Sequence, residues 1–166
     1  MAAAPLAPLH PNQTETAMNG LEDPGLQEQI ELDSRLTDLG RIEPWIDAVA
    51  SRFGVSEQTR FALHLCMEEI LANVVLHGYR SEPGHPIRVA ASSQDGSLLL
   101  SVEDTAPPFE LTERIPPLDG RPVDDLESLQ PGGNGIRLVR HFASSIDYER
   151  TPGGNRLTLG FAIAPR

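Results

Sequence analysis

The sequence predicts an α+β fold, a two-layer sandwich in which helices cover one face of a mostly antiparallel sheet. The first observation behind this is the order of the local patterns, which runs strand, two helices, hairpin, long aperiodic stretch, short helix and second hairpin. The second is size: 166 residues, 39% of them hydrophobic, can bury one sizeable core and leave no room for a second domain.

The first elements follow a segment without structure signals. Residues 1–24 are rich in Ala, Pro and polar residues and show no period, so we expect a flexible tail before a domain over residues 25–166. Loose alternation around Ile30 and Leu32 predicts the first strand. Apolar residues at helical spacing then predict a helix that ends at Gly54. These residues are Ile42, Trp45, Ile46 and Val49.

A second helix is predicted directly after the first. Ser56 is suited to cap its N-terminus, residues 61–76 form its body, and Gly78 stands where a helix C-terminus favours glycine. The only cysteine, Cys66, lies within this apolar helix and has no partner for an internal disulfide. We therefore expect a small buried hydrophobic side chain there, not a reactive thiol.

The clearest hairpin joins two strand-like runs, residues 87–93 and 97–104. Between them lie Gln94, Asp95 and Gly96, and an Asp-Gly turn tolerates positive φ. A stretch without period follows from residue 105 to about residue 131 and holds six of the fifteen prolines. A loop of that length inside a compact domain is typical of a lid or a binding loop.

The C-terminal part predicts one more helix and a closing hairpin. The helix is short, with apolar residues at Ile136, Val139 and Phe142. Residues 145–150 and 155–164 are strand-like and flank the turn sequence TPGG.

Charge and composition exclude several classes of function. The formal charge of −11 and the pI near 4.8 repel phosphate backbones, so they disfavour nucleic acid and anionic membranes and favour a protein partner. All thirteen basic residues are arginine, and the absence of lysine excludes a GK[ST] P-loop and the strand lysine of ordinary protein kinases. No unbroken apolar run approaches the roughly 20 residues of a membrane span, and the N-terminus lacks a secretion signal. We expect a cytoplasmic protein.

Three polar residues interrupt the apolar second helix at a regular spacing. Glu69, Asn73 and His77 are four residues apart, so they point to one side of a helix. Taken alone, the pattern also suits the solvated stripe of an amphipathic helix. A carboxylate and a carboxamide one turn apart that face a cavity can instead accept a proton and offer an oxygen to Mg²⁺.

Two further features carry chemistry only in combination. Asp104 ends a predicted strand, where an aspartate also simply begins a turn. Gly132, Gly133 and Gly135 precede the short helix, where glycines let the backbone approach a phosphate and the helix N-terminus supplies donors. A glycine cluster alone is more often a plain loop.

The order and spacing of these features resemble a known family. Three motifs in this order are similar to the N, G1 and G2 boxes of the GHKL ATPase superfamily. They are E-x-x-x-N followed by H-G-Y, a strand that ends in Asp, and, after a lid, G-x-G-I-x-L-V. Three sequence segments also resemble the stand-alone anti-sigma-factor serine/threonine kinases. They are EEILANVVLHGY, the PF after the aspartate, and GGNRLTL near the C-terminus. The resemblance covers roughly residues 26–163 and implies the Bergerat-type ATP-binding fold.

The resemblance implies a role for each matching residue. Asn73 ligates a Mg²⁺ ion that bridges the phosphates of ATP, and Glu69 is the base toward the attacking hydroxyl. Asp104 accepts a hydrogen bond from the adenine amino group. The backbone around Gly133 and Gly135 cradles the phosphates, and Ile136 and Arg137 follow in the same nucleotide-binding box. His77 matches the family's box without an assigned role.

One position departs from the family pattern. The G1 box usually reads D-x-G, whereas Ala106 stands at the position of the glycine. A Cβ there excludes most positive-φ conformations and brings a methyl group toward the base, which predicts weaker ATP binding than is typical of the family.

Two classes of function fit the pattern. In the first, the protein is a kinase that moves the γ-phosphate of ATP to a serine or threonine on a small antagonist protein and sequesters a sigma factor or similar regulator. In the alternative, it is a binding module that uses nucleotide only to set its shape while it sequesters such a partner. Glu69 favours the kinase, because a pure binding module needs no base at that place. A homodimer is compatible with either class.

Overall fold

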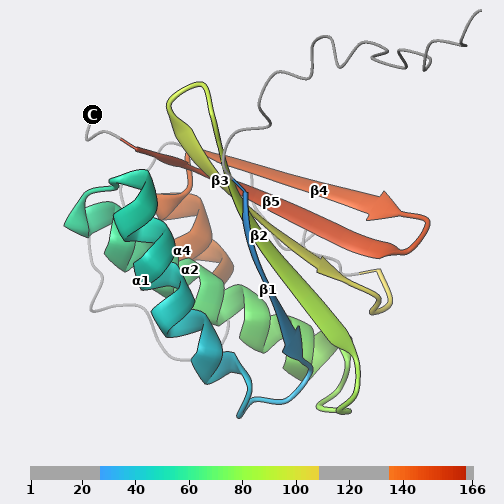
Figure 1. The fold of residues 1–166 in the computed structure, drawn as a ribbon. Coiled ribbons are helices and arrows are strands. Elements are labelled where there is room, and N and C mark those ends of the chain that lie inside the picture. Colours follow the sequence, from blue (N-terminus) through green and yellow to red (C-terminus); the bar gives the residue numbers. More distant parts are fainter. Residues whose placement is uncertain (1–26, 109–134, 164–166) are drawn as a thin grey trace, which may run out of the picture.

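Helices cover one face of an antiparallel sheet in the computed structural model, which describes residues 27–108 and 135–163 (Figure 1). The five-stranded sheet has the order β1-β2-β3-β5-β4, and every neighbouring pair is antiparallel. In chain order the elements are β1 Glu28–Asp33, η1 Leu39–Arg41, α1 Ile42–Phe53, α2 Glu57–Asn73, η2 Val74–Gly78, β2 Pro86–Gln94, β3 Ser97–Asp104, α4 Gly135–Phe142, β4 Ser145–Thr151 and β5 Gly154–Ala162. The predicted fold class and element order are confirmed.

The hydrophobic core lies between the sheet and the helices. Alternate residues of β3 and β5 point to the helix side because the side chains of a strand alternate between its two faces. The helices meet them with the apolar faces that the sequence predicted. The buried residues at this interface include Leu98, Leu100, Leu157, Leu159 and Phe161 on the strands and Ile46, Val49, Leu63, Cys66, Met67 and Leu71 on the helices.

Helix α2 is the central helix of this core. Ser56 caps it as predicted, since its Oγ accepts a hydrogen bond from the N–H of Thr59 at 3.1 Å. Burial raises the pKa of the Cys66 thiol to about 12, with a further contribution from the charge of Glu69. The raised pKa favours the protonated thiol, and the predicted burial of Cys66 is confirmed.

The continuous helix from Glu57 to Gly78 is longer and more apolar than the sequence led us to expect. Its 22 residues are, by length and composition, long and apolar enough to cross a membrane. In the fold it lies along the sheet, and its apolar face supplies the core (Figure 1). It is therefore a core helix of the domain.

The end of this helix differs from the prediction. Residues Val74–Gly78 form a π-helical turn, in which the N–H of Tyr79 bonds to the carbonyl of Val74 at 2.9 Å. Gly78 is not a left-handed C-cap, because the left-handed residues come later, at Arg80 and Ser81. Gly54 at the end of α1 does adopt that conformation, with φ of 64°.

Both predicted hairpins form. The first turns through Asp95 and Gly96, both at positive φ, as a two-residue connection of this kind requires. The second turns through Pro152 and Gly153 and enters β5 at Gly154, where φ is 151°. A Cβ on Gly154 would lie 1.9 Å from the carbonyl oxygen of Asp104, so only glycine fits where β5 passes the end of β3.

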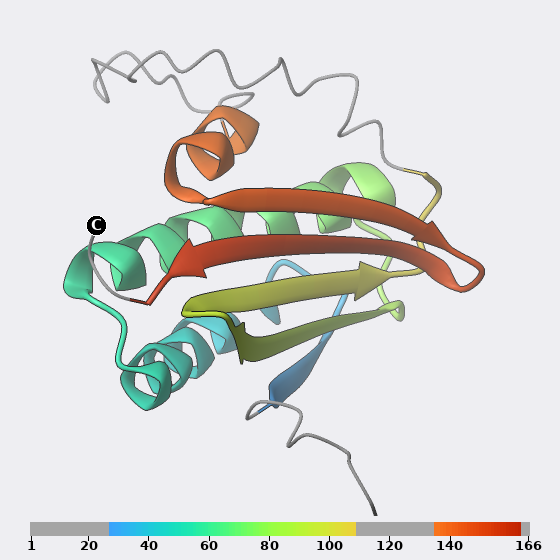
Figure 2. The same ribbon diagram turned by 90° about the horizontal axis from the view of Figure 1, so that it is seen from above.

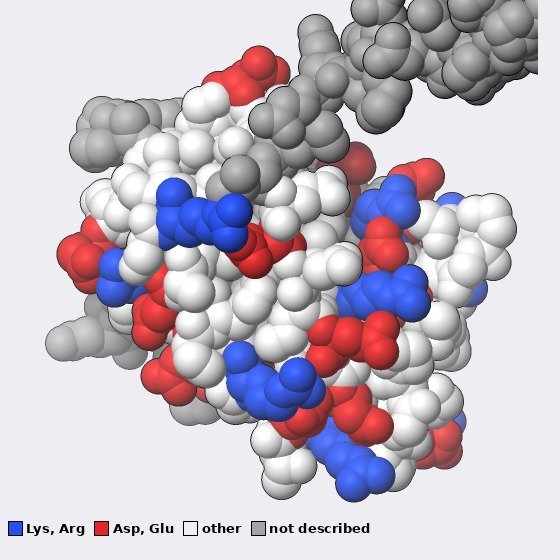
Figure 3. All heavy atoms as spheres, viewed as in Figure 1, with Lys and Arg blue, Asp and Glu red and all other residues white. Residues whose placement is uncertain are grey.

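The face of the sheet opposite the helices carries a row of alternating charges, one from each strand. The five residues lie in register across the sheet and are, from β1 to β4, Glu31, Arg88, Glu103, Arg156 and Glu149. Ion pairs join Glu31 to Arg88 at 3.1 Å and Arg156 to Glu103 at 2.7 Å. Figure 3 shows acidic and basic side chains alternating on this part of the molecule. The row is largely solvated, and its two arginines offset two of its three glutamates, which indicates a structural surface.

Candidate active site

Asp104 lies at the end of β3, on the helix side of the sheet. Val102, two residues earlier, is buried against the helices, and Asp104 shares its face because strand side chains alternate. The antiparallel register of β3 and β5 places Asn155 directly opposite. The predicted adenine-binding carboxylate is therefore held at a sheet end beside a polar partner from a distant part of the chain.

One carboxylate oxygen of Asp104 is held by two donors. Oδ1 accepts the N–H of Ala106 at 2.8 Å and Nδ2 of Asn155 at 2.7 Å. Oδ2 accepts no hydrogen bond from residues 27–108 or 135–163. Burial raises the pKa of Asp104, while the two hydrogen bonds and the charge of Arg150 lower it and so partly offset the burial. The result is a half-buried carboxyl group with one oxygen fixed and the other available to a ligand.

Asn155 links Asp104 to β4 and to the chain after β3. Its side chain is 4% exposed. Its Oδ1 accepts hydrogen bonds from the hydroxyl of Tyr148 at 2.6 Å and from a guanidinium nitrogen of Arg150 at 2.8 Å. Its Nδ2 also donates to the carbonyl oxygen of Ala106 at 3.1 Å. Sequence reasoning missed all three of Asn155, Arg150 and Tyr148, because only the strand register brings them to Asp104.

The end of the second helix is tied to the same loop. The N–H of Thr105 donates to the hydroxyl oxygen of Tyr79 at 2.7 Å. The ring of Tyr79 stacks on His85, with 4.5 Å between the ring centres and 3° between the planes. A Cβ on Gly78 would lie 3.0 Å from the Cβ of Ala106. Residues 77–79 and residues 103–106, which the resemblance assigned to two boxes of one nucleotide site, are thus neighbours in space.

Ala106, which departs from the D-x-G pattern, does not adopt a positive φ. The only non-glycine residues with positive φ in the described part of the chain are Arg80, Ser81 and Asp95. Ala106 is buried, and its methyl group packs against the space left by Gly78. The backbone at this position therefore accommodates alanine, and the weaker ATP binding expected from its methyl group stays a prediction.

The three polar residues of the helix do not form one uniform stripe. Glu69 and Asn73 lie one turn apart within α2 and are both half-buried, whereas His77 lies in the π-turn and is exposed. A π-turn is wider than an α-turn, so residues four apart no longer stand above each other. The geometry keeps Glu69 and Asn73 as a pair and separates His77 from them.

The oxygen donors of this pair suit Mg²⁺, which prefers carboxylate and carboxamide oxygens and is usually bound by one or two protein groups together with substrate phosphates. Among residues 27–108 and 135–163, no group of three or more His, Cys, Asp or Glu side chains is arranged to hold a metal ion. The donor set therefore fits a metal that arrives with a nucleotide, not a metal caged by the protein alone.

The glycine-rich box is only partly visible. Gly133 and nearly all of the predicted lid lie outside the described residues. Gly135, Ile136 and Arg137 form the first turn of α4, and their side chains are likewise not described. Helix α4 packs on α2 (Figure 2), in part through the edge-to-face contact of Phe61 and Phe142 with ring centres 6.2 Å apart. This packing brings the predicted G2 box to the helix that carries Glu69 and Asn73.

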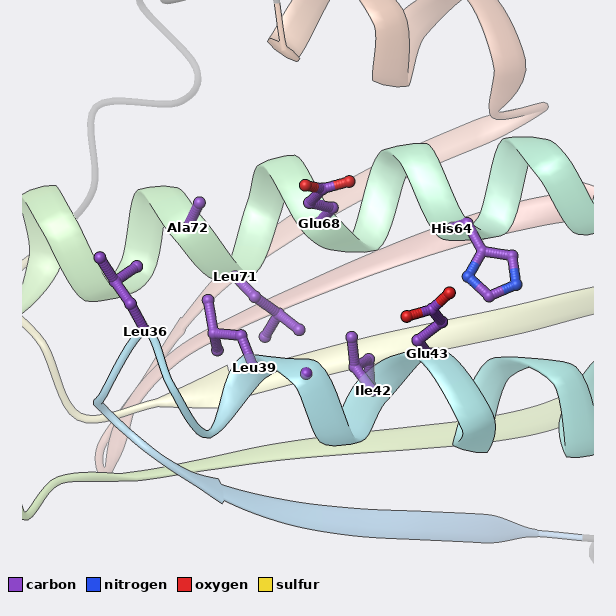
Figure 4. Close-up of a pocket in the computed structure, with 9 residues that line it drawn as sticks. Leu36, Leu39, Ile42, Glu43, His64, Glu68, Leu71 and Ala72 are labelled. Atoms are coloured by element: carbon purple, nitrogen blue, oxygen red, sulfur yellow. The ribbon is translucent and has the colours of Figure 1, made fainter.

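The described surface includes a smaller and a larger hollow. The smaller, about 190 Å³, adjoins Asp104, Thr105 and Asn155. The larger, about 490 Å³, lies between the start of α1 and α2 (Figure 4). It is lined by Leu36, Leu39, Gly40, Ile42, Glu43, His64, Glu68, Leu71 and Ala72. None of the predicted site residues lines this larger hollow, so we place the site at Asp104 on its chemistry.

Comparisons with known proteins identify the family of this chain. Residues 32–161 match the model of the histidine kinase-like ATPase domain. The serine/threonine-protein kinase BtrW of Bordetella bronchiseptica is 37% identical over 123 residues, which is 73% of this chain and 83% of the relative. The serine-protein kinase RsbW of Listeria innocua is 27% identical over 112 residues, 67% of this chain and 70% of the relative.

A solved structure supports the fold. The crystal structure of the RsbU and RsbW domains of a Mycobacterium tuberculosis protein aligns with a TM-score of 0.59 and 19% sequence identity. The alignment covers 86% of this chain and 34% of the solved chain, so this chain spans about a third of that protein's length. At this identity the likeness is one of fold.

Proposed function

The chain belongs to the histidine kinase-like ATPase domain family and, with its curated relatives, to the serine/threonine-protein kinases, and on that premise we propose that Asp104, Asn73 and Glu69 form one phosphotransfer site. ATP is the phosphate donor that the family implies. The acceptor is a serine or threonine hydroxyl of a partner protein.

The observation that carries this proposal is the state of the Asp104 carboxylate. Two donors hold Oδ1 in place, and Oδ2 is left without a partner in the described part of the chain. With the carboxylate held in place through Oδ1, the free Oδ2 can accept a hydrogen bond from a donor such as the adenine amino group, and such a bond is stronger in a half-buried site than in water. The contacts of Thr105 with Tyr79 and of Ala106 with Gly78 support this proposal, because they keep the loop after Asp104 beside the end of the helix that carries Asn73.

Asn73 and Glu69 serve the phosphate end of the nucleotide. The carboxamide oxygen of Asn73 would hold Mg²⁺, with Glu69 one turn away on the same helix. When bound, this ion neutralises charge on the phosphates and orients them. The backbone of the glycine-rich box, with Gly133 and Gly135, would add donors at the start of α4, and Ile136 and Arg137 complete that box.

Glu69 acts as the general base. Its carboxylate takes the proton of the attacking serine or threonine hydroxyl while the oxygen of that hydroxyl bonds to the γ-phosphorus. The bond from the γ-phosphorus to the bridging oxygen breaks, and ADP leaves with the electron pair of that bond. The half-buried position of Glu69 inside a helix holds the base in one place for this transfer.

The partners that we propose are proteins in the cytoplasm. The formal charge of −11 disfavours nucleic acid and anionic membranes, so a switch of the anti-sigma-factor type would act by direct protein contact. In this proposal a small antagonist protein carries the phosphoacceptor, and a sigma factor or similar regulator is sequestered. A homodimer is compatible with this role.

The test has two steps. Calorimetry with ADP and Mg²⁺ should give heat for the wild-type protein, and Asp104→Asn should weaken adenine nucleotides much more than it lowers thermal stability. Labelled ATP should then transfer phosphate to a candidate antagonist protein encoded nearby in the genome. Absence of heat at millimolar ADP overturns the nucleotide site. Binding of ATP and of a cognate partner without any transfer leaves the binding-module alternative in its place.

A further inference from the structure

Arg150 on β4 reaches the adenine-binding side of the site without being part of the boxes assigned to it. The residue is exposed, but its guanidinium donates to Oδ1 of Asn155 at 2.8 Å and to the carbonyl oxygen of Ala106 at 3.0 Å. We propose that Arg150 is a positioning residue: it sets the direction of the Asn155 amide and through it aims the free oxygen of Asp104 at the adenine amino group. This inference rests on the proposed function of Asp104.

The argument begins with what each group can donate. The amide of Asn155 has an acceptor end and a donor end, and the two orientations have nearly the same shape. A guanidinium only donates, so Arg150 requires the amide oxygen on its own side. The hydroxyl of Tyr148, at 2.6 Å from the same oxygen, can donate or accept and sets no direction by itself.

The other end of the amide faces acceptors. Nδ2 lies 2.7 Å from Oδ1 of Asp104 and 3.1 Å from the carbonyl oxygen of Ala106. If the Asn155 amide were rotated to the opposite orientation, its carbonyl oxygen would face these two oxygens. Asn155 and Asp104 could then form a hydrogen bond only if Asp104 took up a proton. Such a protonated carboxyl group would have given up its role as a charged acceptor for adenine.

Arg150 opposes that reversed state in two ways. It pairs with the amide oxygen, and its positive charge favours the ionised form of Asp104. The groups that face Asp104 from the neighbouring elements are Asn155 on β5, Arg150 on β4 and the backbone of Ala106. Arg150 is the only cation among them in the described part of the chain.

The experiment compares two nucleotides that differ at one group. The full chain is titrated with ADP and with purine riboside 5′-diphosphate, which lacks the 6-amino group, both with Mg²⁺ at pH 7. The variants are Arg150→Met and Arg150→Lys, which keeps a donor-only cation. Arg156→Met is the matched control, since Arg156 lies on the next strand and pairs with Glu103 and Glu149 on the opposite face of the sheet.

We expect Arg150→Met to weaken ADP binding by about tenfold, the size of one charge-assisted hydrogen bond in a site of this kind. Binding of the amine-free nucleotide should change by less than about twofold. Arg150→Lys should recover most of the ADP affinity, and Arg156→Met should bind both nucleotides as the wild type does. In a double-mutant cycle, Arg150→Met should add little to the loss caused by Asp104→Asn.

Three outcomes would overturn the inference. The first is wild-type ADP affinity in Arg150→Met. The second is an equal loss of affinity for both nucleotides, which would indicate a general role in folding or in the loop after β3. Additive losses in the cycle would separate Arg150 from Asp104. If the wild-type protein binds neither nucleotide, the proposed function itself fails, and that result is distinct because it appears before any variant is compared. Circular dichroism identifies any variant that fails to fold. If Arg150→Met does not fold, the inference is tested by the nucleotide binding of Arg150→Lys alone.

Discussion

Gly78 and Ala106 face each other without room for a second methyl group. A Cβ on Gly78 would lie 3.0 Å from the Cβ of Ala106, closer than side-chain carbons normally approach. This contact joins the end of the π-turn to the loop that follows Asp104. The alanine that departs from the D-x-G pattern is accommodated because a glycine lies opposite.

Gly78→Ala should therefore destabilise the protein by about 1 to 3 kcal/mol, the usual effect of overpacking a filled interior. Ala106→Gly in the same chain should recover part of the loss, less the roughly 0.5–1 kcal/mol that a new glycine costs in backbone entropy. Urea denaturation of the wild type, both single variants and the double variant gives the coupling free energy between positions 78 and 106. Strictly additive effects would mean that the two residues do not touch.

Gly154→Ala should be more severe than Gly153→Ala, its neighbour in the same turn. A Cβ at position 154 meets the carbonyl oxygen of Asp104 at 1.9 Å, whereas one at position 153 finds nothing closer than 4.0 Å. We expect Gly154→Ala to cost about 3 kcal/mol or more, because strained φ and backbone overlap add, and to weaken ADP binding. Thermal melts and calorimetry measure both. Equal melting points for the two variants would contradict the close approach of the strands.

Glu69→Gln should separate binding from chemistry. Glutamine keeps the size and most of the hydrogen bonding of Glu69 but removes its basic oxygen, so ATP should still bind while phosphotransfer falls by about 10²-fold or more. Asn73→Ala should weaken Mg²⁺-dependent binding as well as transfer. Glu68→Gln, at the adjacent exposed position, is the control and should leave both unchanged. Transfer by Glu69→Gln at the wild-type rate would show that the base is another group.

Binding of adenine nucleotides should weaken in acid because Asp104 must be ionised to accept the amino group. Burial raises its pKa above the ordinary value of 3.8, so the loss begins at a higher pH than a solvated aspartate would show. ADP affinity measured between pH 7 and pH 4 should fall as pH drops through this raised pKa. Asp104→Asn should remove that dependence. An affinity that is flat down to pH 4 would contradict the assignment.

The same shift has a consequence for stability, with the opposite sign from a salt-bridged aspartate. The folded state holds the proton of Asp104 more tightly than the unfolded state, so this residue contributes stability when protonated. That contribution is present below pH 3.8 and is lost as pH rises through the raised pKa. Urea denaturation at a series of pH values should show that the free energy of unfolding depends on pH differently in the wild type and in Asp104→Asn. That difference vanishes if the pKa of Asp104 is the same in the folded and the unfolded state.

The sequence by itself determined the elements and their order. The Ser56 cap, the end of α1 at Gly54 and the Asp95-Gly96 turn were all predicted, as were the strands from their alternation. Each of these depends on residues within about four positions of one another, so the chain carries the information locally. The pairing of Glu69 with Asn73 is of the same kind.

The tertiary structure alone decided how Asp104 is held. Asn155 lies 51 positions from Asp104 along the chain, and Arg150 reaches Ala106 across 44. No local pattern marks these residues, because their contact depends on the register of β3, β5 and β4. The role of Gly78 is also tertiary, since it comes from the methyl group opposite and not from its own φ. Strand register and close packing join residues that are far apart in sequence, and only the folded chain specifies which ones meet.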